Sequence, residues 1–270
     1  MNTTPNPTTP DTVVLIHGLW LNARSWEPWV ERYEQRGLKV IARSWPQMDG
    51  DIADLRTDTS AFDDLGIEAI LDHYTQIING LEQPPIIIGH SFGGAFTQVL
   101  VDRGLGAAGV AIDSGPVKGI LKLPLSQLRA GFPVLKNPLN RHRAVPITAE
   151  EFHYAFTNTL NDEESARVYE HYWVPGPGRV LFEGALANLS PHSPLHVNFR
   201  NADRAPLLLI AGGEDHTAPQ SINESNYQHY KSDAVTELKV YPGRAHFHVG
   251  LEGWEEVADY AIDWSLRNAR

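Results

Sequence analysis

The sequence predicts an α/β protein built on a sheet of about six mostly parallel strands flanked by helices. Short apolar runs typical of buried strands alternate with segments whose apolar residues recur at helical spacing. Between residues 115 and 205 this alternation stops. We therefore expect a sheet domain that carries one long insertion.

The expected elements follow one another from residue 12. Strands are predicted at 12–16, 39–42, 86–88, 108–112, 206–211 and 235–241, and helices at 25–36, 66–79 and 95–103. Only eleven residues precede the first strand, which leaves no room for an opening antiparallel hairpin. Right-handed crossovers should place the active loops at the carboxyl ends of the strands, where ligands bind in open α/β sheets.

A nucleophile motif joins the third strand to its helix. The residues from Gly89 to Gly93 fit the pattern G-x-S-x-G, with Ser91 at its centre. In this setting the two glycines allow strand and helix to approach closely, and the serine hydroxyl is lifted above the end of the strand. The sequence therefore predicts Ser91 as a nucleophile, whereas the same residues in another setting would indicate only a loop.

An activated serine needs a histidine base that is oriented by a carboxylate. Asp215 lies in the turn after the strand at 206–211 and is the favoured acid. Asp113 at the end of the strand at 108–112 is the alternative, because some members of the family that this chain resembles have their carboxylate at this place.

Two histidines compete for the role of base. His246 and His248 both follow the strand at 235–241, and both could reach back toward Ser91. In the family that this chain resembles, the loop spacing favours the first histidine after the glycine, here His246, which leaves His248 to line the pocket or to pack in the core.

These motifs resemble the α/β-hydrolase fold from about residue 11 to residue 266. Within that superfamily the chain is most similar to small serine esterases and to cofactor-free, non-haem haloperoxidase-like hydrolases. It differs from the haloalkane dehalogenase and epoxide hydrolase branches, which have an aspartate nucleophile where this chain has Ser91. The resemblance rests on His17-Gly18-Leu19-Trp20, on the motif at Ser91, on Gly-x-x-Asp ending at Asp215, on Gly-x-x-His ending at His246, and on the chain order of Ser91, Asp215 and His246.

The resemblance also implies an oxyanion hole made of backbone amides. One donor is expected to be the N–H of Phe92, next to the nucleophile, and the other the N–H of Leu19 in the loop after the first strand. Gly18 would let that loop fold against Ser91, and Trp20 beside it is expected to form a pocket wall.

The chain divides into a flexible N-terminal tail at 1–11, a hydrolase core at 12–115 and 205–270, and a helical cap at 116–204. In the cap, Thr148 and Glu151 form the pattern of a capping box, and a second helix is expected at about 162–173. The predicted substrate-binding residues are Trp20, Phe152, Phe156 and His248, although most cap aromatics are expected to pack the cap onto the core.

Composition narrows the possible partners. The formal net charge of −11 argues against nucleic acid and against an anionic membrane. The chain has no cysteine, and its first ten residues lack the features of a signal peptide. We expect a cytoplasmic enzyme that acts on a small-molecule substrate without a metal or organic cofactor, and the oligomeric state stays open.

Together these features predict a serine hydrolase of the carboxylesterase type. Its substrate is expected to be an ester, or an amide or carbamate, of a small and largely hydrophobic molecule. A lyase or C–C bond hydrolase that uses the same triad is the alternative, as is a perhydrolase with haloperoxidase activity. A ligand receptor without catalysis is disfavoured by the intact triad.

Overall fold

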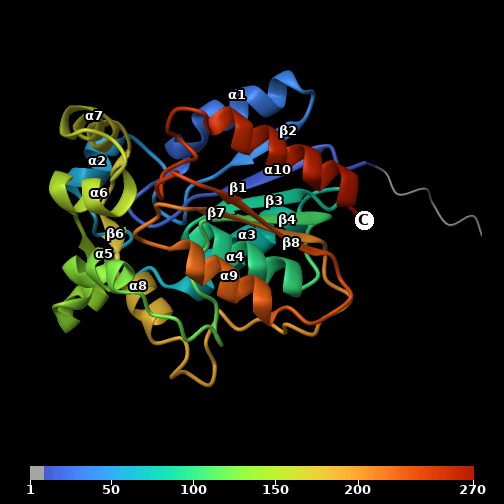
Figure 1. Cartoon of the computed structure of the whole chain (residues 1–270). Coiled ribbons are helices and arrows are strands. Elements are labelled where there is room, and N and C mark those ends of the chain that lie inside the picture. The colour runs from blue at the N-terminus through green and yellow to red at the C-terminus, as the bar shows by residue number, and fades with distance from the viewer. Residues whose placement is uncertain (1–8) are drawn as a thin grey trace, which may run out of the picture.

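A computed structural model describes residues 9–270, so most of the predicted tail lies outside the described residues. Six parallel strands form one sheet in the order β2-β1-β3-β4-β7-β8, which confirms the predicted fold class (Figure 1). The strands are β1 (Thr12–Ile16), β2 (Lys39–Ala42), β3 (Ile86–His90), β4 (Ala108–Ile112), β7 (Leu207–Gly212) and β8 (Thr236–Tyr241).

Burial along the strands explains why their sequences differ. All residues of β1, β3, β4 and β7 are buried, because helices cover both faces of a parallel sheet. The edge strands β2 and β8 are partly exposed and carry charged residues, which suits strands with only one neighbour.

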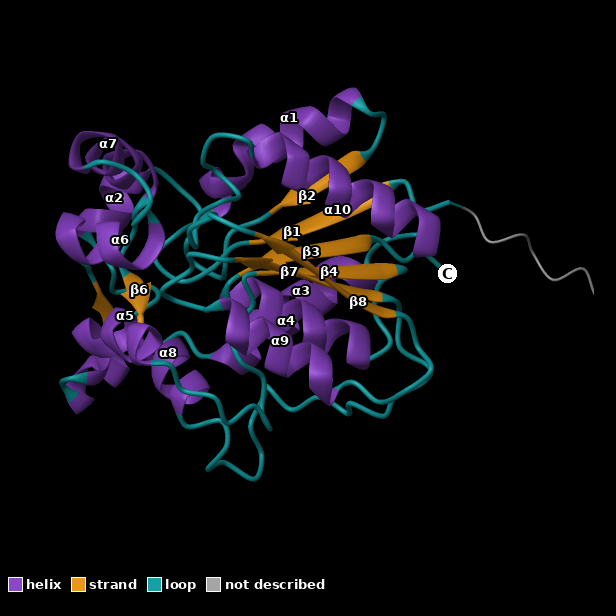
Figure 2. Cartoon of the chain, in the orientation of Figure 1, coloured by secondary structure: helices purple, strands orange, loops and turns teal. Residues whose placement is uncertain are grey.

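Helices cover both faces of the sheet (Figure 2). Helices α1 and α10 lie on one face, and α3, α4 and α9 lie on the other. No helix within residues 9–270 is both long enough and apolar enough to cross a membrane. The bounds are α1 (Glu27–Gln35), α3 (Ile67–Asn79), α4 (Phe92–Asp102), α9 (Gln220–His229) and α10 (Trp254–Asn268).

The first predicted helix begins differently from the expectation. A 3₁₀ turn, η1 (Ala23–Trp26), precedes α1, and the Asn22 side chain caps that turn by accepting a hydrogen bond from the Arg24 N–H at 3.1 Å. The polar cap and the proline in the first turn of α1 separate the two helical pieces.

The segment between β4 and β7 contains helices and two short strands, and it lies beyond the carboxyl ends of the main strands (Figure 1). The predicted capping box of Thr148 and Glu151 is present, and Asn161 and Glu164 form a second one. The elements are α5 (Leu125–Leu135), η2 (Pro138–His142), β5 (Ala144–Val145), α6 (Ala149–Phe156), α7 (Asp162–Tyr172), β6 (Gly176–Pro177) and α8 (Gly178–Ala185).

A further helix from the core contacts this cap. Helix α2 (Ile52–Thr57) was not predicted, and its Arg56 donates hydrogen bonds to the backbone oxygens of Trp173 at 3.1 Å and Glu170 at 2.8 Å. The same guanidinium lies 4.5 Å from the centre of the Trp173 ring. The long connection after β2 therefore anchors the end of α7.

Candidate active site

Ser91 occupies a strained turn between β3 and α4. Its backbone has φ 58° and ψ −118°, outside the ordinary regions for a residue with a side chain. A Cβ at Gly89 would lie 2.0 Å from the Gly93 carbonyl oxygen, and one at Gly93 would lie 2.1 Å from the Ile16 carbonyl oxygen. Only glycine fits at these two positions, so the motif glycines hold the serine in this turn.

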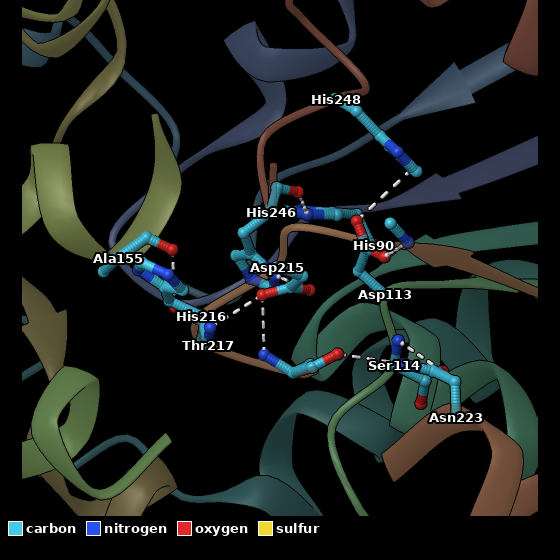
Figure 3. Close-up of polar contacts among 12 residues, drawn as sticks. His90, Asp113, Ser114, Ala155, Asp215, His216, Thr217, Asn223, His246 and His248 are labelled. Atoms are coloured by element: carbon cyan, nitrogen blue, oxygen red, sulfur yellow. Dashed lines mark hydrogen bonds and ion pairs between the residues drawn. The ribbon is translucent and has the colours of Figure 1, made fainter. Parts of the chain in front are cut away.

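Asp215 and His246 form a hydrogen-bonded pair (Figure 3). His246 Nδ1 lies 2.7 Å from Asp215 Oδ2, and both side chains are fully buried. The other carboxylate oxygen, Oδ1, accepts from the N–H groups of Thr217 at 2.6 Å and Ala218 at 2.8 Å. These donors fix the carboxylate, which in turn places the imidazole proton on Nδ1.

The second ring nitrogen of His246 is therefore a hydrogen-bond acceptor. Nε2 is buried and makes no hydrogen bond with any residue in the range 9–270, Ser91 included. In proteins without a bound substrate, catalytic hydrogen bonds are often long and tighten only when substrate is present. The geometry thus offers an oriented base at the edge of the sheet where Ser91 lies.

The loop that carries Asp215 is bonded to the cap. His216 Nδ1 donates to the Tyr154 carbonyl oxygen at 3.0 Å, and Thr217 Oγ1 donates to the Ala155 carbonyl oxygen at 2.6 Å. Both acceptors belong to α6. These two hydrogen bonds tie the Asp215 loop to the cap.

Asp113 and His248 form a second carboxyl–imidazole pair, also fully buried. Asp113 Oδ1 accepts from the Gly212 N–H at 2.7 Å, and Oδ2 lies 3.3 Å from His248 Nε2. Burial raises the pKa of Asp113 well above its usual range, and the charge of Asp215 adds to the rise. Burial also lowers the pKa of His248 to about 3, with a further contribution from His246. Both shifts favour an uncharged pair.

Two further buried histidines act through the backbone. His90 Nε2 donates to the His246 carbonyl oxygen at 2.8 Å, and His17 Nδ1 donates to the Gly18 carbonyl oxygen at 2.8 Å. His17 Nε2 also accepts from the Trp45 N–H at 3.0 Å. Burial lowers the pKa of both rings, that of His17 to about 4. These neutral rings hold the loops that surround the site.

One group of buried side chains could hold a metal ion. His90, Asp113 and His246 each offer a ligand atom, and these atoms lie within 4.8 Å of one another. His246 is already bonded to Asp215, and His90 donates to a backbone oxygen. The hydrogen bonds of the site therefore account for how these three groups are oriented.

The loop after β1 approaches Ser91 closely. A Cβ at Gly18 would lie 2.7 Å from Ser91 Cβ, so only glycine lets the loop pass this close. Phe92 is the first residue of α4, and the first N–H groups of a helix have no partner within the helix. These features suit the predicted donors Phe92 and Leu19, which stay a proposal.

An apolar cavity of about 260 Å³ opens at Ser91. The predicted pocket residues Trp20 and Phe156 line it, together with Leu19 and Phe92. The cavity also has walls that the sequence did not predict, because they come from the irregular chain after β4 and from α5 and α8: Pro116, Ile120, Leu121, Leu123, Leu128, Leu135 and Leu181.

Two predicted pocket residues do not line this cavity. Phe152 is buried beneath Phe156, with the two rings stacked 4.7 Å apart. His248 is buried beside Asp113. The prediction that these two side chains line the pocket is therefore corrected. Helical spacing and proximity in sequence do not show which side chain will be covered by another one.

Comparison with known proteins agrees with this architecture. The model of the family described as "Alpha/beta hydrolase family" matches residues 13–260. No curated protein matches the chain significantly.

Several solved structures share the fold over nearly the whole chain. A monoacylglycerol lipase from Paleococcus ferrophilus is 19% identical with a TM-score of 0.67, and the match covers 97% of this chain and 96% of the lipase. A thermophilic esterase from Thermogutta terrifontis is 18% identical with a TM-score of 0.67, covering 100% and 97% of the two chains. A pyrethroid hydrolase from Sphingobium faniae is 18% identical with a TM-score of 0.65, covering 95% and 98%.

Proposed function

The chain belongs to the alpha/beta hydrolase family, and we propose that it is a serine hydrolase that cleaves carboxylic esters of small hydrophobic molecules. In this proposal Ser91 is the nucleophile, His246 the general base and Asp215 the residue that orients the base. One observation carries it: the Asp215–His246 pair leaves Nε2 free at the sheet edge where the strained Ser91 faces an apolar cavity.

The proposed reaction proceeds in two halves. Ser91 Oγ attacks the ester carbonyl carbon while Nε2 of His246 takes its proton, and the carbonyl oxygen becomes an oxyanion near the N–H groups of Leu19 and Phe92. The tetrahedral intermediate then breaks its bond to the alcohol oxygen, which leaves with the proton from Nε2. Water, deprotonated by the same nitrogen, next attacks the acyl carbon. The bond to Ser91 Oγ then breaks, Oγ takes the proton back from Nε2, and the acid is released.

Asp215 would act throughout without changing its own protonation. Its hydrogen bond keeps the Nδ1 proton in place and stabilises the imidazolium that forms at each proton transfer. Burial of both side chains shields this interaction from water, where it would be weaker.

The cavity supports an uncharged, hydrophobic substrate. Its lining is dominated by leucine, isoleucine and aromatic side chains, and such surfaces bind apolar groups through the area that they remove from water. The three structural relatives described above are named for the hydrolysis of a monoacylglycerol, an ester and a pyrethroid, which is compatible with an ester substrate. A cytoplasmic location and a reaction without cofactor also remain part of the proposal.

Hydrolysis of p-nitrophenyl esters of increasing acyl length tests the proposal directly. We expect turnover by the parent protein and a loss of about 10⁶ in kcat for Ser91→Ala, as for removal of other serine nucleophiles. A serine-directed phosphonate should label the parent once, at Ser91, and leave the variant unlabelled. Undiminished turnover by Ser91→Ala would refute the mechanism.

A further inference from the structure

Exposed large apolar side chains gather on one part of the cap. Ten such side chains stand out within residues 9–270, and only Tyr227 and Val235 lie outside 121–189. Single exposed apolar residues are ordinary on protein surfaces, but a cluster marks an interaction site. We call the following set the apolar rim: Leu121, Leu123, Leu125, Leu128, Phe132, Leu186 and Leu189.

Hydrogen bonds join the two segments that form the apolar rim. The Asn188 side chain accepts from the Gly119 N–H at 2.7 Å and donates to the Ile120 carbonyl oxygen at 2.8 Å. Lys118 Nζ donates to the Ser190 carbonyl oxygen at 2.6 Å. The turn after α8 is thus fastened to the loop before α5, so the two segments that carry the rim lie side by side.

Three residues of the apolar rim lie at the opening of the cavity. Leu121, Leu123 and Leu128 line the same cavity as Ser91, yet Leu121 is 80% exposed. A side chain that lines a cavity and also faces solvent lies at its mouth. A substrate that enters by this mouth passes these leucines on its way to Ser91.

The charge of this region is opposite to that of the whole chain. The formal net charge is −11, but residues 114–149 contain no aspartate or glutamate. Within the described residues, four exposed basic side chains of this segment form no salt bridge: Lys122, Lys136, Arg141 and Arg143. Arg129 lies over the Tyr154 ring at 3.9 Å, and His142 of the same segment contacts Asp64 at 2.9 Å.

We propose that the apolar rim and the basic residues around it dock on an anionic lipid surface. The leucines would enter the acyl region while the lysines and arginines meet the headgroups. Two copies of this chain could not bury the rim against each other as readily, because their basic residues would face one another. The acidic remainder of the molecule would be repelled by the same surface, which directs the cavity mouth toward the lipid.

The substrate part of this inference rests on the proposed function. A cavity that opens at a lipid surface would receive amphiphilic esters directly from that surface. Our expectation that the chain has no membrane partner came from its total charge, and total charge averages over a segment whose local charge has the opposite sign.

Sedimentation with lipid vesicles tests the docking, with the full-length protein at low ionic strength. Vesicles of phosphatidylcholine are compared with an equimolar mixture of phosphatidylcholine and phosphatidylglycerol. We expect binding to the mixed vesicles, weak binding to the neutral ones, and release by salt. Equal binding to both vesicles, or to neither, would overturn the proposal.

Variants at exposed positions outside the cavity lining then locate the surface. Lys136→Glu combined with Arg141→Glu should weaken binding at least about 25-fold, since each basic residue near an anionic surface contributes about fivefold. Leu125→Ser combined with Leu189→Ser, at sites 83% and 80% exposed, should weaken it about tenfold or more. Parental binding by both double variants would refute the assigned face.

The matched control is Lys231→Glu combined with Val235→Ser. These exposed residues precede β8 and lie at the amino ends of the strands, away from the cap, so the control should bind as the parent does. If the control loses as much binding, general electrostatic attraction explains the binding and the assigned face is wrong. If the parent is a dimer that only the rim variants dissociate, the rim binds a second copy of the chain instead. Hydrolysis of a water-soluble p-nitrophenyl ester is measured separately, so loss of vesicle binding and loss of the proposed activity are distinguishable.

Discussion

The site contains two buried carboxyl–imidazole pairs, which differ in the number of hydrogen bonds that each carboxyl group accepts. Asp215 accepts three hydrogen bonds, from two backbone N–H groups and from His246 at 2.7 Å. Asp113 accepts one backbone hydrogen bond and lies 3.3 Å from His248. The two pairs share residue types, burial and sheet edge, so only the hydrogen bonds distinguish them.

This difference assigns different roles to the two acids. Hydrogen-bond donors replace the water that a carboxylate loses on burial, and Asp215 has them. Asp113 has few, and burial raises its pKa well above the usual range. A carboxyl that holds its proton cannot stabilise an imidazolium, and this supports the proposal that Asp215 takes part in the reaction while Asp113 packs beneath it.

The largest expected effect separates the two histidines. His246→Gln should lower kcat/KM by about 10⁶, because no base remains to take the serine proton. His248→Gln should retain most of the activity. Ester hydrolysis and phosphonate labelling of Ser91 measure the difference, with circular dichroism to show that both variants are folded. The opposite pattern would move the base to His248.

Substitution of the two acids should produce a smaller difference in activity than substitution of the two histidines. Asp215→Asn should slow hydrolysis by about 10⁴, because an amide cannot keep the imidazole in the required tautomer. Asp113→Asn retains an acceptor oxygen for the Gly212 N–H and replaces a protonated group, so less than about a tenfold loss is expected. Steady-state kinetics of the matched pair decides between the acids, and a larger loss in Asp113→Asn would reverse the assignment.

The low pKa of His248 makes a prediction about stability. Burial lowers this pKa to about 3, so the folded state binds fewer protons than the unfolded state. The contribution of His248 is fully present above its ordinary pKa of about 6.5 and is lost as the pH falls toward 3.

Between pH 7 and pH 5, His248 should cost the parent about 2 kcal/mol of unfolding free energy. His248→Gln removes this dependence, so the difference in stability between parent and variant should shift by that amount in favour of the variant at pH 5. Urea denaturation at the two pH values measures the shift. His17 and His90 act in the same direction in both proteins and cancel in the comparison. An unchanged difference would mean that His248 is charged or exposed.

The smallest expected effect concerns the cap side of the catalytic pair. Phe156 lines the cavity and its ring lies 5.1 Å from that of His246, whereas Phe152 packs one layer further from the cavity. Phe156→Leu should change KM for hydrophobic esters several-fold, while Phe152→Leu should cost about 1 kcal/mol of stability with little change in KM. Equal changes in KM would place both rings at the substrate.

Regular periodicity explains which parts of the fold could be predicted. The strands of the sheet are short apolar runs, and the turn at Ser91 depends on glycines at set positions, so both are visible in the chain itself. Parallel strands bring their carboxyl ends to one edge, which explains why Ser91, Asp215 and His246 could be expected near one another. Their order along the chain was expected from the resemblance to the α/β-hydrolase fold.

Helix α5 of the cap escaped prediction, because the pattern of burial along it contradicts the usual one. Helix α5 buries Ala130, Gly131 and Val134, while Leu125 and Phe132 face solvent. A prediction that buries the large apolar residues of a helix is therefore wrong for α5. Pro133 within the helix weakens the helical sequence pattern further.

Residue types, spacing and chain order thus determine the sheet, the nucleophile turn and a short list of acids and bases, since these depend on local sequence and on a topology with few alternatives. Other features depend on which groups from distant segments come into contact. These are the choice between Asp215 and Asp113, the burial of His248 and Phe152, and the exposure of the apolar rim. Contacts between distant segments determine which polar groups are hydrogen-bonded and which side chains water can reach. Neither is defined until the chain has folded.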